Sequence, residues 1–334
     1  MADVDIRKAP TAPEFARFRE SFGQRFLLTV DTEEEFDWRA PLDRYAHRID
    51  AVPALRKFQQ FCEGFSVCPI YLVDYPIATA LGATEALRHS IQAGRAEIGV
   101  QLHPWVNPPH DEEVNAFNSY AGNLPEHLER AKFMQLRDVI ESNFGVPPRM
   151  FRCGRYGAGP NTAQILIDGG ISIDTSVRAR FDYSRDGGPN YREHPVYPYW
   201  VDRQNGLLEL PLTTVYWGLL GRFGPFLYPR MWRLPQLRGV LAKAGLLERI
   251  PLTPEGVSIT EVIRGIDTAI DEGLPVLVLS FHSPSLVPGN TPYVGSDDQL
   301  DEFYDWWRAV FAHLAQRGIA PAGIGDIMAA VELA

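Results

Sequence analysis

The sequence predicts an α/β fold, a barrel of about seven strand and helix units, from three observations. Short apolar runs recur along the 334 residues, stretches with helical spacing separate them, and polar residues directly follow several of the runs. Strands that alternate with helices are typical of a parallel sheet or barrel. Because such folds build their active sites at the carboxyl ends of the strands, the polar residues there are the first candidates for function.

Seven apolar runs are the candidate strands. Each is short, and most are rich in Val, Ile, Leu or Phe, as buried parallel strands are. They cover residues 26–30, 67–73, 97–102, 150–153, 171–174, 207–212 and 276–281. Their number suits a barrel of about seven units.

Six intervening stretches have apolar residues at spacings of three and four, which predicts helices. They cover residues 51–62, 77–92, 126–143, 161–168, 258–272 and 299–316. Glycines follow four of them where a left-handed C-cap is expected, at Gly145, Gly169, Gly273 and Gly318. Two longer stretches, 107–123 and 181–252, do not fit the alternation of strands and helices. The second is rich in Tyr, Trp, Pro and Gly and is a candidate for one wall of a substrate-binding site.

Composition narrows the class of protein. With 45% hydrophobic and 22% charged residues the chain is an ordinary globular one, and we interpret residues 1–334 as a single elaborated domain with its core at about 26–325. A split into two domains near residue 190 is the alternative. A net charge of −10 argues against a nucleic-acid partner. No signal peptide or apolar run of about 18 residues is found, so we expect a cytoplasmic protein without a membrane partner.

Two further expectations concern thiols and assembly. The odd number of cysteines, three, does not suggest a disulfide framework, and we expect reduced core thiols. The aromatic helix candidate 299–316 either covers the barrel or pairs two subunits in a homo-oligomer. The sequence does not separate these two roles.

The first candidate strand ends in four carboxylates within five residues, Asp31 and Glu33 to Glu35. Acids at this spacing can bind a metal, act as a base or open the next helix. We expect Asp31 and Glu33 at the rim of the barrel, and Glu34 and Glu35 as solvated loop charges.

The third candidate strand ends at His103, whose backbone is restricted by the following Pro104. A neutral imidazole at a strand end suits Zn²⁺ or another transition metal, and Gln101 lies on the same face of the strand. Asp31, Glu33 and His103 are therefore expected to meet at one rim. The alternative is a capping acid and a hydrogen-bonded histidine without a metal.

Two later strands also end in polar residues. Arg152 and Tyr156 follow the fourth strand, and Arg152 is either a plain salt-bridge partner or the group that orients a catalytic carboxylate. His282 ends the last apolar strand, and a histidine can be protonated near neutral pH, as a general acid requires. The neighbouring Ser283 lacks a nucleophile elbow and is not a candidate nucleophile.

These motifs, Thr29-Val-Asp31, His103-Pro104, Phe151-Arg152 with Tyr156, and Leu279-Ser-Phe-His282, resemble those of the polysaccharide deacetylases, the NodB homology family or carbohydrate esterase family 4. The resemblance covers roughly residues 26–325. It implies a distorted (β/α)7-type barrel that removes acetyl groups from sugars with a divalent metal. It also implies that Asp31 is the base, Arg152 its orienting partner, Tyr156 the oxyanion contributor and His282 the acid.

The metal motif departs from that family. Thr32 stands where the family has a second aspartate and Gly99 where it has its first histidine, whereas His103 matches the second histidine. If a metal site is rebuilt, Glu33 and His103 are its expected ligands, with Asp31 or Gln101 as the additional candidates and Zn²⁺ as the expected ion. The resemblance extends to metal-independent amidohydrolases of the same fold, which act on small cyclic amides and ureides.

Three functions therefore compete. The leading hypothesis is a hydrolase that removes an acetyl or similar acyl group from a saccharide or sugar-like metabolite through an activated water. The second is a metal-independent amidohydrolase. The third is a catalytically inactive barrel that binds a carbohydrate or a protein, with the aromatic residues of 181–252 either stacking on sugars or packing over the barrel mouth. These aromatic residues are Tyr183, Tyr191, Tyr197, Tyr199, Trp200, Tyr216 and Trp217.

Overall fold

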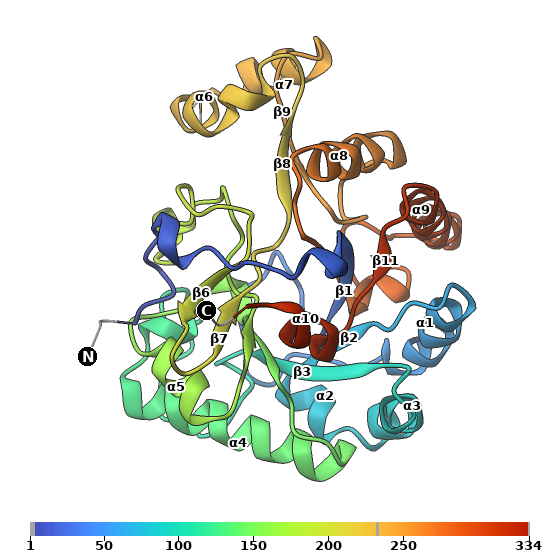
Figure 1. The fold of residues 1–334 in the computed structure, drawn as a ribbon. Coiled ribbons are helices and arrows are strands. Elements are labelled where there is room, and N and C mark those ends of the chain that lie inside the picture. The colour runs from blue at the N-terminus through green and yellow to red at the C-terminus, as the bar shows by residue number, and fades with distance from the viewer. Residues whose placement is uncertain (1–3, 232–233, 333–334) are drawn as a thin grey trace.

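A curled sheet of nine strands forms the centre of the computed structural model, which describes residues 4–231 and 234–332 (Figure 1). The strand order is β10-β1-β2-β3-β4-β5-β7-β6, with β11 also paired to β1, and every pair is parallel except β6 with β7. The strands are β1 (Arg25–Thr32), β2 (Ile70–Val73), β3 (Glu97–Leu102), β4 (Met150–Cys153), β5 (Ile173–Asp174), β6 (Tyr199–Asp202), β7 (Leu207–Glu209), β10 (Val276–His282) and β11 (Ala320–Pro321). All seven candidate strands are present.

The sheet curls into a barrel in which β7 and β10 are not joined by a regular ladder of hydrogen bonds. Between β7 and β10 the chain at Thr213 runs beside β10, where the Thr213 amide donates to the Val278 carbonyl oxygen at 3.3 Å. The Val278 amide donates to Thr213 Oγ1 at 2.9 Å. The Leu252 carbonyl oxygen also accepts from the Ser280 amide at 3.3 Å, so a few irregular contacts replace a regular strand ladder at this position, and the predicted distorted α/β barrel is confirmed.

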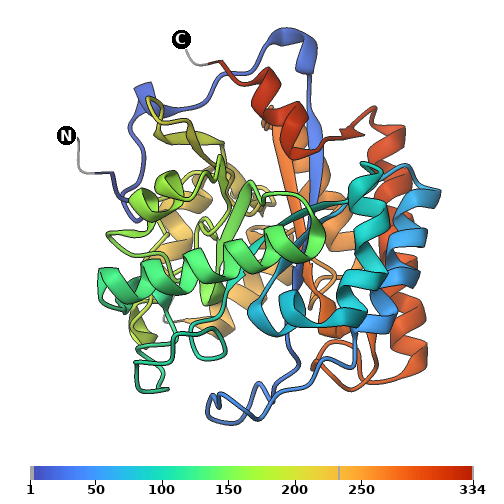
Figure 2. The same ribbon diagram turned by 90° about the horizontal axis from the view of Figure 1, so that it is seen from below.

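Helices cover the outside of the curled sheet (Figure 2). The helices of the described residues are α1 (Val52–Gly64), α2 (Tyr75–Thr79), α3 (Leu81–Gln92), α4 (Glu126–Phe144), α5 (Thr162–Asp168), α6 (Gly224–Arg230), α7 (Pro235–Lys243), α8 (Ile259–Asp271), α9 (Asp297–Gln316) and α10 (Ile324–Ala330). Of these, α6 and α7 stand away from the barrel and α10 lies at the amino ends of the strands. Short 3-10 turns are η1 (Ala12–Glu14), η2 (Glu20–Phe22), η3 (Ala121–Asn123), η4 (Gly154–Tyr156), η5 (Ser184–Asp186), η6 (Gly221–Phe223) and η7 (Ser283–Leu286). The six predicted helices are found, except that the candidate 77–92 divides into α2 and α3.

The predicted glycine caps hold at three of four positions. Gly145, Gly273 and Gly318 have φ values of 80°, 73° and 72°, in the left-handed region. The prediction for Gly169 was wrong, because its φ is −86° and the left-handed residue is the next one, Gly170, at 77°. Where two glycines follow a helix, either can adopt the left-handed turn, and the spacing alone does not choose between them.

The barrel interior changes from apolar to polar along the strands. In β1, Leu27, Thr29 and Asp31 alternate onto the inner face, and all three are buried. Leu27 lies in an apolar cluster that α10 helps to close, together with Met150 and Val278 of neighbouring strands. The amino ends of the strands are thus filled with hydrocarbon, and the polar groups come together at the carboxyl ends.

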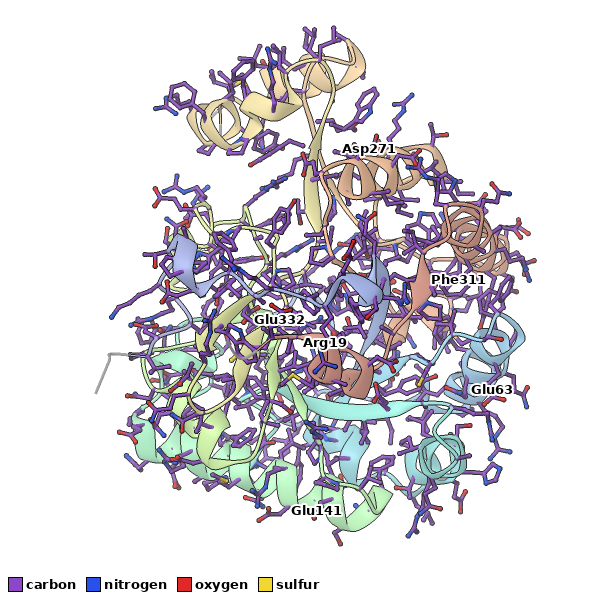
Figure 3. All side chains as sticks on the ribbon, viewed as in Figure 1. Arg19, Glu63, Glu141, Asp271, Phe311 and Glu332 are labelled. Carbon is purple, nitrogen blue, oxygen red and sulfur yellow. The ribbon has the colours of Figure 1, made fainter. Side chains whose placement is uncertain are left out.

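A larger apolar layer lies between the sheet and the outer helices, where side chains fill the space seen between ribbons (Figure 3). Two of the three cysteines, Cys62 and Cys153, are buried there, and all three are free, as expected. Among the described residues, no helix is long and apolar enough to cross a bilayer.

The stretch 181–252 is not one loop but several elements. After β6 and β7 it forms a two-stranded antiparallel ribbon, β8 (Thr214–Trp217) with β9 (Glu248–Pro251), which carries η6, α6 and α7 away from the barrel (Figure 1). Of the seven aromatic residues named above, four are buried: Tyr191, Tyr199, Trp200 and Tyr216. Of the aromatic residues proposed to stack on sugars, Tyr183 lines the large cavity described below.

Candidate active site

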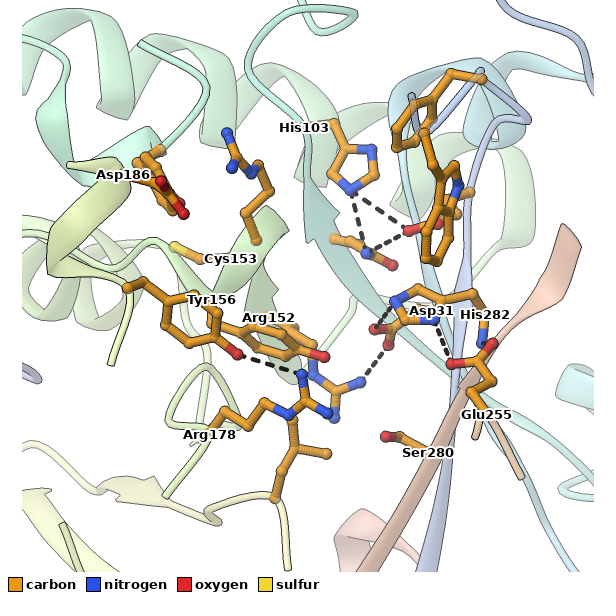
Figure 4. A pocket seen from close by; sticks show the side chains of 18 of the residues that line it. Asp31, His103, Arg152, Cys153, Tyr156, Arg178, Asp186, Glu255, Ser280 and His282 are labelled. Carbon is orange, nitrogen blue, oxygen red and sulfur yellow. Dashed lines mark hydrogen bonds and ion pairs between the residues drawn. The ribbon is translucent and has the colours of Figure 1, made fainter. Parts of the chain in front are cut away.

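A cavity of about 640 Å³ opens at the carboxyl ends of the strands, where most of the predicted site residues meet (Figure 4). Asp31, Arg152, His282 and His103 come from the ends of four different strands and all line it. Parallel register brings Asp31 directly opposite His282, because β1 pairs with β10 along its whole length. Residues far apart in the sequence therefore form one site.

Asp31 is held by Arg152. One guanidinium nitrogen of Arg152, Nη1, donates to Asp31 Oδ1, and both side chains are buried. The same guanidinium is fixed by Thr29 Oγ1 at 2.9 Å and by the Thr175 carbonyl oxygen at 3.1 Å. The pair leaves Asp31 Oδ2 directed toward His282, and the contact is compatible with both sequence interpretations of Arg152, a salt-bridge partner or an orienting group.

His282 faces Asp31 on one side and Glu255 on the other. Its Nε2 lies 3.7 Å from Asp31 Oδ2, while its Nδ1 lies 2.7 Å from Glu255 Oε2. Burial acts to lower the pKa of His282, but the nearby carboxylates of Glu255, Glu33 and Asp31 outweigh it and raise that pKa to about 10. A protonated imidazole at neutral pH is the form that a general acid needs.

Glu255 is itself a fixed group. Its Oε1 accepts hydrogen bonds from the His282 backbone amide at 3.0 Å and from Ser285 Oγ at 2.9 Å. Burial would raise the pKa of Glu255, but the imidazolium of His282 and these hydrogen bonds hold it below its usual value. The two side chains stabilise each other as an ion pair, with the imidazole directed into the cavity.

A second cluster in the same cavity joins Glu33, Gln101 and His103. Gln101 Nε2 lies 2.9 Å from Glu33 Oε2 and 3.2 Å from His103 Nε2, and the carboxylate and imidazole atoms are 3.5 Å apart. All three side chains are buried. Burial raises the pKa of Glu33 to about 8, and nearby His282 and His103 only partly oppose this.

Glu34 holds the imidazole of His103 on the side opposite to Gln101. Its Nδ1 lies 2.8 Å from Glu34 Oε2, and the other oxygen of Glu34 accepts from Trp105 Nε1 at 3.0 Å. The Glu34 amide in turn donates to Asp74 Oδ2 at 2.7 Å. Burial raises the pKa of both carboxyl groups, to about 7 for Glu34. Glu34, Asp74 and His103 lie close enough to hold a metal, but their facing atoms already bond to one another or to backbone.

The expectation that Glu34 and Glu35 are solvated loop charges was wrong. Glu34 is fully buried beneath His103, and Glu35 is 3% exposed. The Glu35 carboxylate accepts from the backbone amides of Asp50 at 2.6 Å and Ala51 at 2.8 Å, next to the start of α1. An acid at a helix start satisfies amides that have no partner within the helix. This is the third of the roles considered for the acidic run, and Glu35 fills it.

The donor set for a metal differs from that of the family. Gly99 has no room for a histidine, because a Cβ atom there would lie 2.7 Å from the Met150 carbonyl oxygen. Thr32 is buried with its hydroxyl donating to the Val30 carbonyl oxygen at 2.9 Å. The residues that do fit a divalent cation are Glu33, Gln101 and His103, whose facing atoms lie within 3.5 Å of one another.

Two features favour this set. Gln101 Oε1 is buried without a hydrogen-bond partner, and rotation of the amide would place this oxygen where its nitrogen now lies. His103 offers Nε2 to the cavity while a carboxylate holds its other nitrogen, which is the usual support of a metal-binding histidine. Arg152 occupies Oδ1 of Asp31, so only the Oδ2 atom of this candidate is free in the cavity.

Tyr156 lies on a strained turn at the cavity wall. It and Arg155 have φ values of 61° and 54°, in the left-handed region that non-glycine residues rarely occupy. Such strain is found at functional sites and turns. The neighbouring Gly154 permits the turn, since a Cβ atom there would overlap the ring of His103.

Arg178 was not predicted and lines the same cavity. It stacks on the Phe181 ring at 4.1 Å, and its Nη1 donates to the Tyr183 hydroxyl at 3.3 Å. Glu255 and Asp74 were also missed. Neither follows a recognisable family motif, although Asp74 directly follows a predicted strand and could have been noticed by that position.

The fold and the site define an α/β barrel with an aspartate, an arginine and a histidine at the carboxyl ends of its strands. No protein-family model matches the sequence, and no curated protein matches it either. Solved structures do match.

The chain is similar to the 4-alpha-glucanotransferase from Thermococcus litoralis, with 14% identity and a TM-score of 0.52 over 92% of this chain and 40% of that one. A provisionally assigned polysaccharide deacetylase from Mycobacterium smegmatis matches with 19% identity and a TM-score of 0.47, over 84% and 76%. The PuuE allantoinase matches with 14% identity and a TM-score of 0.47, over 92% and 89%. Of these three matches only the glucanotransferase has a TM-score above 0.5, and at 14% identity it shows a likeness of fold alone.

Proposed function

We propose that the protein is a hydrolase that removes an acetyl or similar acyl group from a saccharide or sugar-like molecule. The observation that carries the proposal is the line of contacts from Arg152 through Asp31 to His282 and Glu255. It sets a carboxylate with one free oxygen 3.7 Å from an imidazolium. A base and an acid side by side at the wall of a cavity are what hydrolysis of an acyl group requires.

In the proposed reaction, Asp31 Oδ2 removes a proton from a water molecule as its oxygen bonds to the acyl carbonyl carbon. Arg152 keeps the carboxylate turned toward the water. Backbone and side-chain groups of the turn at Tyr156 lie at the wall where the carbonyl oxygen would gain charge. His282 gives its Nε2 proton to the leaving nitrogen or oxygen as the carbon–heteroatom bond breaks. The products are the free carboxylic acid and the deacylated amine or alcohol.

Glu33, Gln101 and His103 would hold a divalent metal, with Zn²⁺ as the ion we propose, and the bound metal would supply Lewis acidity to the reacting oxygen. The amide of Gln101 would be an unusual zinc ligand, because protein zinc sites are commonly formed by Cys, His, Asp and Glu side chains. Glu34 would orient the imidazole in either the metal-bound or the metal-free protein.

A metal-independent amidohydrolase is the second candidate, favoured by Thr32 and Gly99, which remove two of the family's three metal ligands. In that case Glu33, with its raised pKa, would supply a hydrogen bond as a neutral acid. An inactive barrel that only binds a carbohydrate is the third candidate. The preserved base, acid and orienting arginine argue against it.

One experiment separates the three. Protein purified without chelator is assayed for metal content and for acetate release from a panel of N- and O-acetylated saccharides, beside a panel of cyclic amides and ureides. We expect acetate release together with a stoichiometric metal that is lost in His103→Ala. Ureide hydrolysis without metal would select the amidohydrolase. Saccharide binding without any hydrolysis would leave only the inactive barrel and refute the proposal.

A further inference from the structure

The segment 218–247, here called the tip, belongs to the stretch 181–252 and has no part in the proposed function. It joins β8 to β9 and contains η6, α6 and α7. Its sequence holds five Arg or Lys residues and no Asp or Glu, in a chain whose net charge is −10. A basic segment of this length within an acidic protein indicates a partner that carries negative charge.

The tip also concentrates exposed hydrocarbon. Of the twelve large hydrophobic side chains exposed in the described part of the chain, six lie in this one segment. They are Leu219, Phe223, Phe226, Leu234, Leu237 and Val240, with Leu219 at 80% and Val240 at 62% exposure. Single exposed apolar residues are ordinary, but a cluster of them marks an interaction site.

The exposure of these side chains does not come from poor packing of the tip. The tip packs around a small core, in which its residues Tyr228 and Leu247 are buried against Tyr216 of β8. Outside that core, basic groups sit on the exposed rings: Arg230 lies 3.4 Å from the centre of the Phe226 ring. Arg222 stacks in the same way on Phe223, at 4.7 Å. At both rings, cation and hydrocarbon therefore lie side by side.

We propose that the tip docks on an anionic lipid surface, with its apolar side chains in the headgroup and acyl boundary and its basic groups on lipid phosphates. Apolar residues flanked by Lys and Arg on a short helical element are typical of proteins that lie on membranes. Basic residues near an anionic leaflet add to the attraction. The expectation of no membrane partner rested on the lack of a spanning segment, and docking on a surface does not need one.

The shape of the tip favours a bilayer over a second protein. Figure 1 shows α6 and α7 standing clear of the barrel at the end of the β8–β9 ribbon. A projecting element can enter a deformable lipid surface, whereas a protein partner would need a matching hollow. The same ribbon reaches the cavity, which Thr214 and Pro251 line at its base. Docking would thus attach the site to the membrane through two short strands.

Vesicle co-sedimentation of the full chain tests the proposal. We expect binding to vesicles of phosphatidylcholine with 30% phosphatidylglycerol, weaker binding in high salt, and little binding to phosphatidylcholine alone. Replacing Leu219 or Val240 with Asp should lower the partition coefficient by about tenfold for each side chain removed from the lipid. The double variant Arg222→Glu, Lys243→Glu should weaken binding only to the anionic vesicles.

Matched controls lie on the barrel. Leu81→Asp removes another side chain that is 73% exposed, and Arg88→Glu reverses an exposed charge on the same helix α3; neither should change vesicle binding. Circular dichroism melts show whether each variant folds. The proposal is overturned if the wild-type chain binds no vesicles, or if the tip variants bind as well as wild type. It is also overturned if ultracentrifugation shows a dimer that Val240→Asp dissociates while vesicle binding is absent.

Discussion

The Glu255→Gln variant should move the titration of His282 toward neutral pH. Glutamine keeps the size of the side chain and can still accept a hydrogen bond, but it removes the negative charge that lies 2.7 Å from Nδ1. The rise in the pKa of His282 from 6.5 to about 10 corresponds to about 5 kcal/mol in favour of the protonated imidazole. Glu255 is the nearest contributor, and Glu33 and Asp31 remain in the variant.

The loss of one close opposite charge lowers a histidine pKa by about 1 to 3, so we expect a pKa between about 7 and 9 in Glu255→Gln. The sign follows from the acid role. His282 is active when protonated, so activity falls as pH rises through its pKa, and the alkaline limb of the pH–rate profile should move to lower pH in the variant. Below pH 6 the two proteins should differ little.

Two measurements follow this shift. Titration of the His282 ring signals by NMR reports the pKa without any substrate, and the pH dependence of acetate release reports it under turnover. Glu302→Gln, an exposed glutamate on α9, is the matched control and should leave both unchanged. An unaltered NMR pKa in Glu255→Gln would show that Glu255 does not hold the proton on His282, and the reasoning would fail.

Three further changes test other parts of the account. Arg152→Lys should lower kcat by about 100-fold with little change in KM, because a lysine cannot bind Asp31 and the other partners of Arg152 at the same time. Steady-state kinetics measure both constants, and an unchanged kcat would contradict the orienting role of Arg152. Glu129→Gln should stabilise the protein by about 3 kcal/mol at pH 8 but not at pH 4. Burial raises the pKa of Glu129 from 4.5 to about 7 in the folded protein. Ionisation of this carboxyl group therefore opposes folding as the pH rises through this range, and glutamine does not ionise. Urea unfolding at both pH values measures this, and equal effects would count against it. Gly99→Ala should cost about 1 to 3 kcal/mol of unfolding free energy, because the added Cβ meets the Met150 carbonyl oxygen at 2.7 Å, and thermal melts would show whether it does.

Much of the fold was predictable because periodicity is a local property. The strands that carry Asp31, His103, Arg152 and His282 read as apolar runs, and parallel packing brings their carboxyl ends together in any barrel of this kind. The ribbon β8–β9 and helices α6 and α7 were not predicted. Their residues mix Pro, Gly and aromatic side chains without a clear period, and their packing depends on long-range contacts.

The site was predictable only where a residue follows a strand. Glu255 lies in a turn after β9, and only the folded chain brings it to His282. Glu34 was misjudged because a run of acids next to a strand is usually solvated, whereas here His103 and Trp105 supply the partners that make its burial tolerable. Sequence patterns give the position of a charge along the chain, but its burial depends on the groups that fold against it.

The central claim is that Asp31 activates water for acyl hydrolysis, and the most direct test compares acetate release by the wild-type chain and Asp31→Asn. Asparagine keeps the shape of the side chain but cannot accept the proton of water. We expect release from at least one acetylated saccharide by the wild-type chain and a loss of about 1000-fold in the variant, with its fold retained by circular dichroism. Equal rates in the two proteins would contradict the assignment of Asp31 as the base.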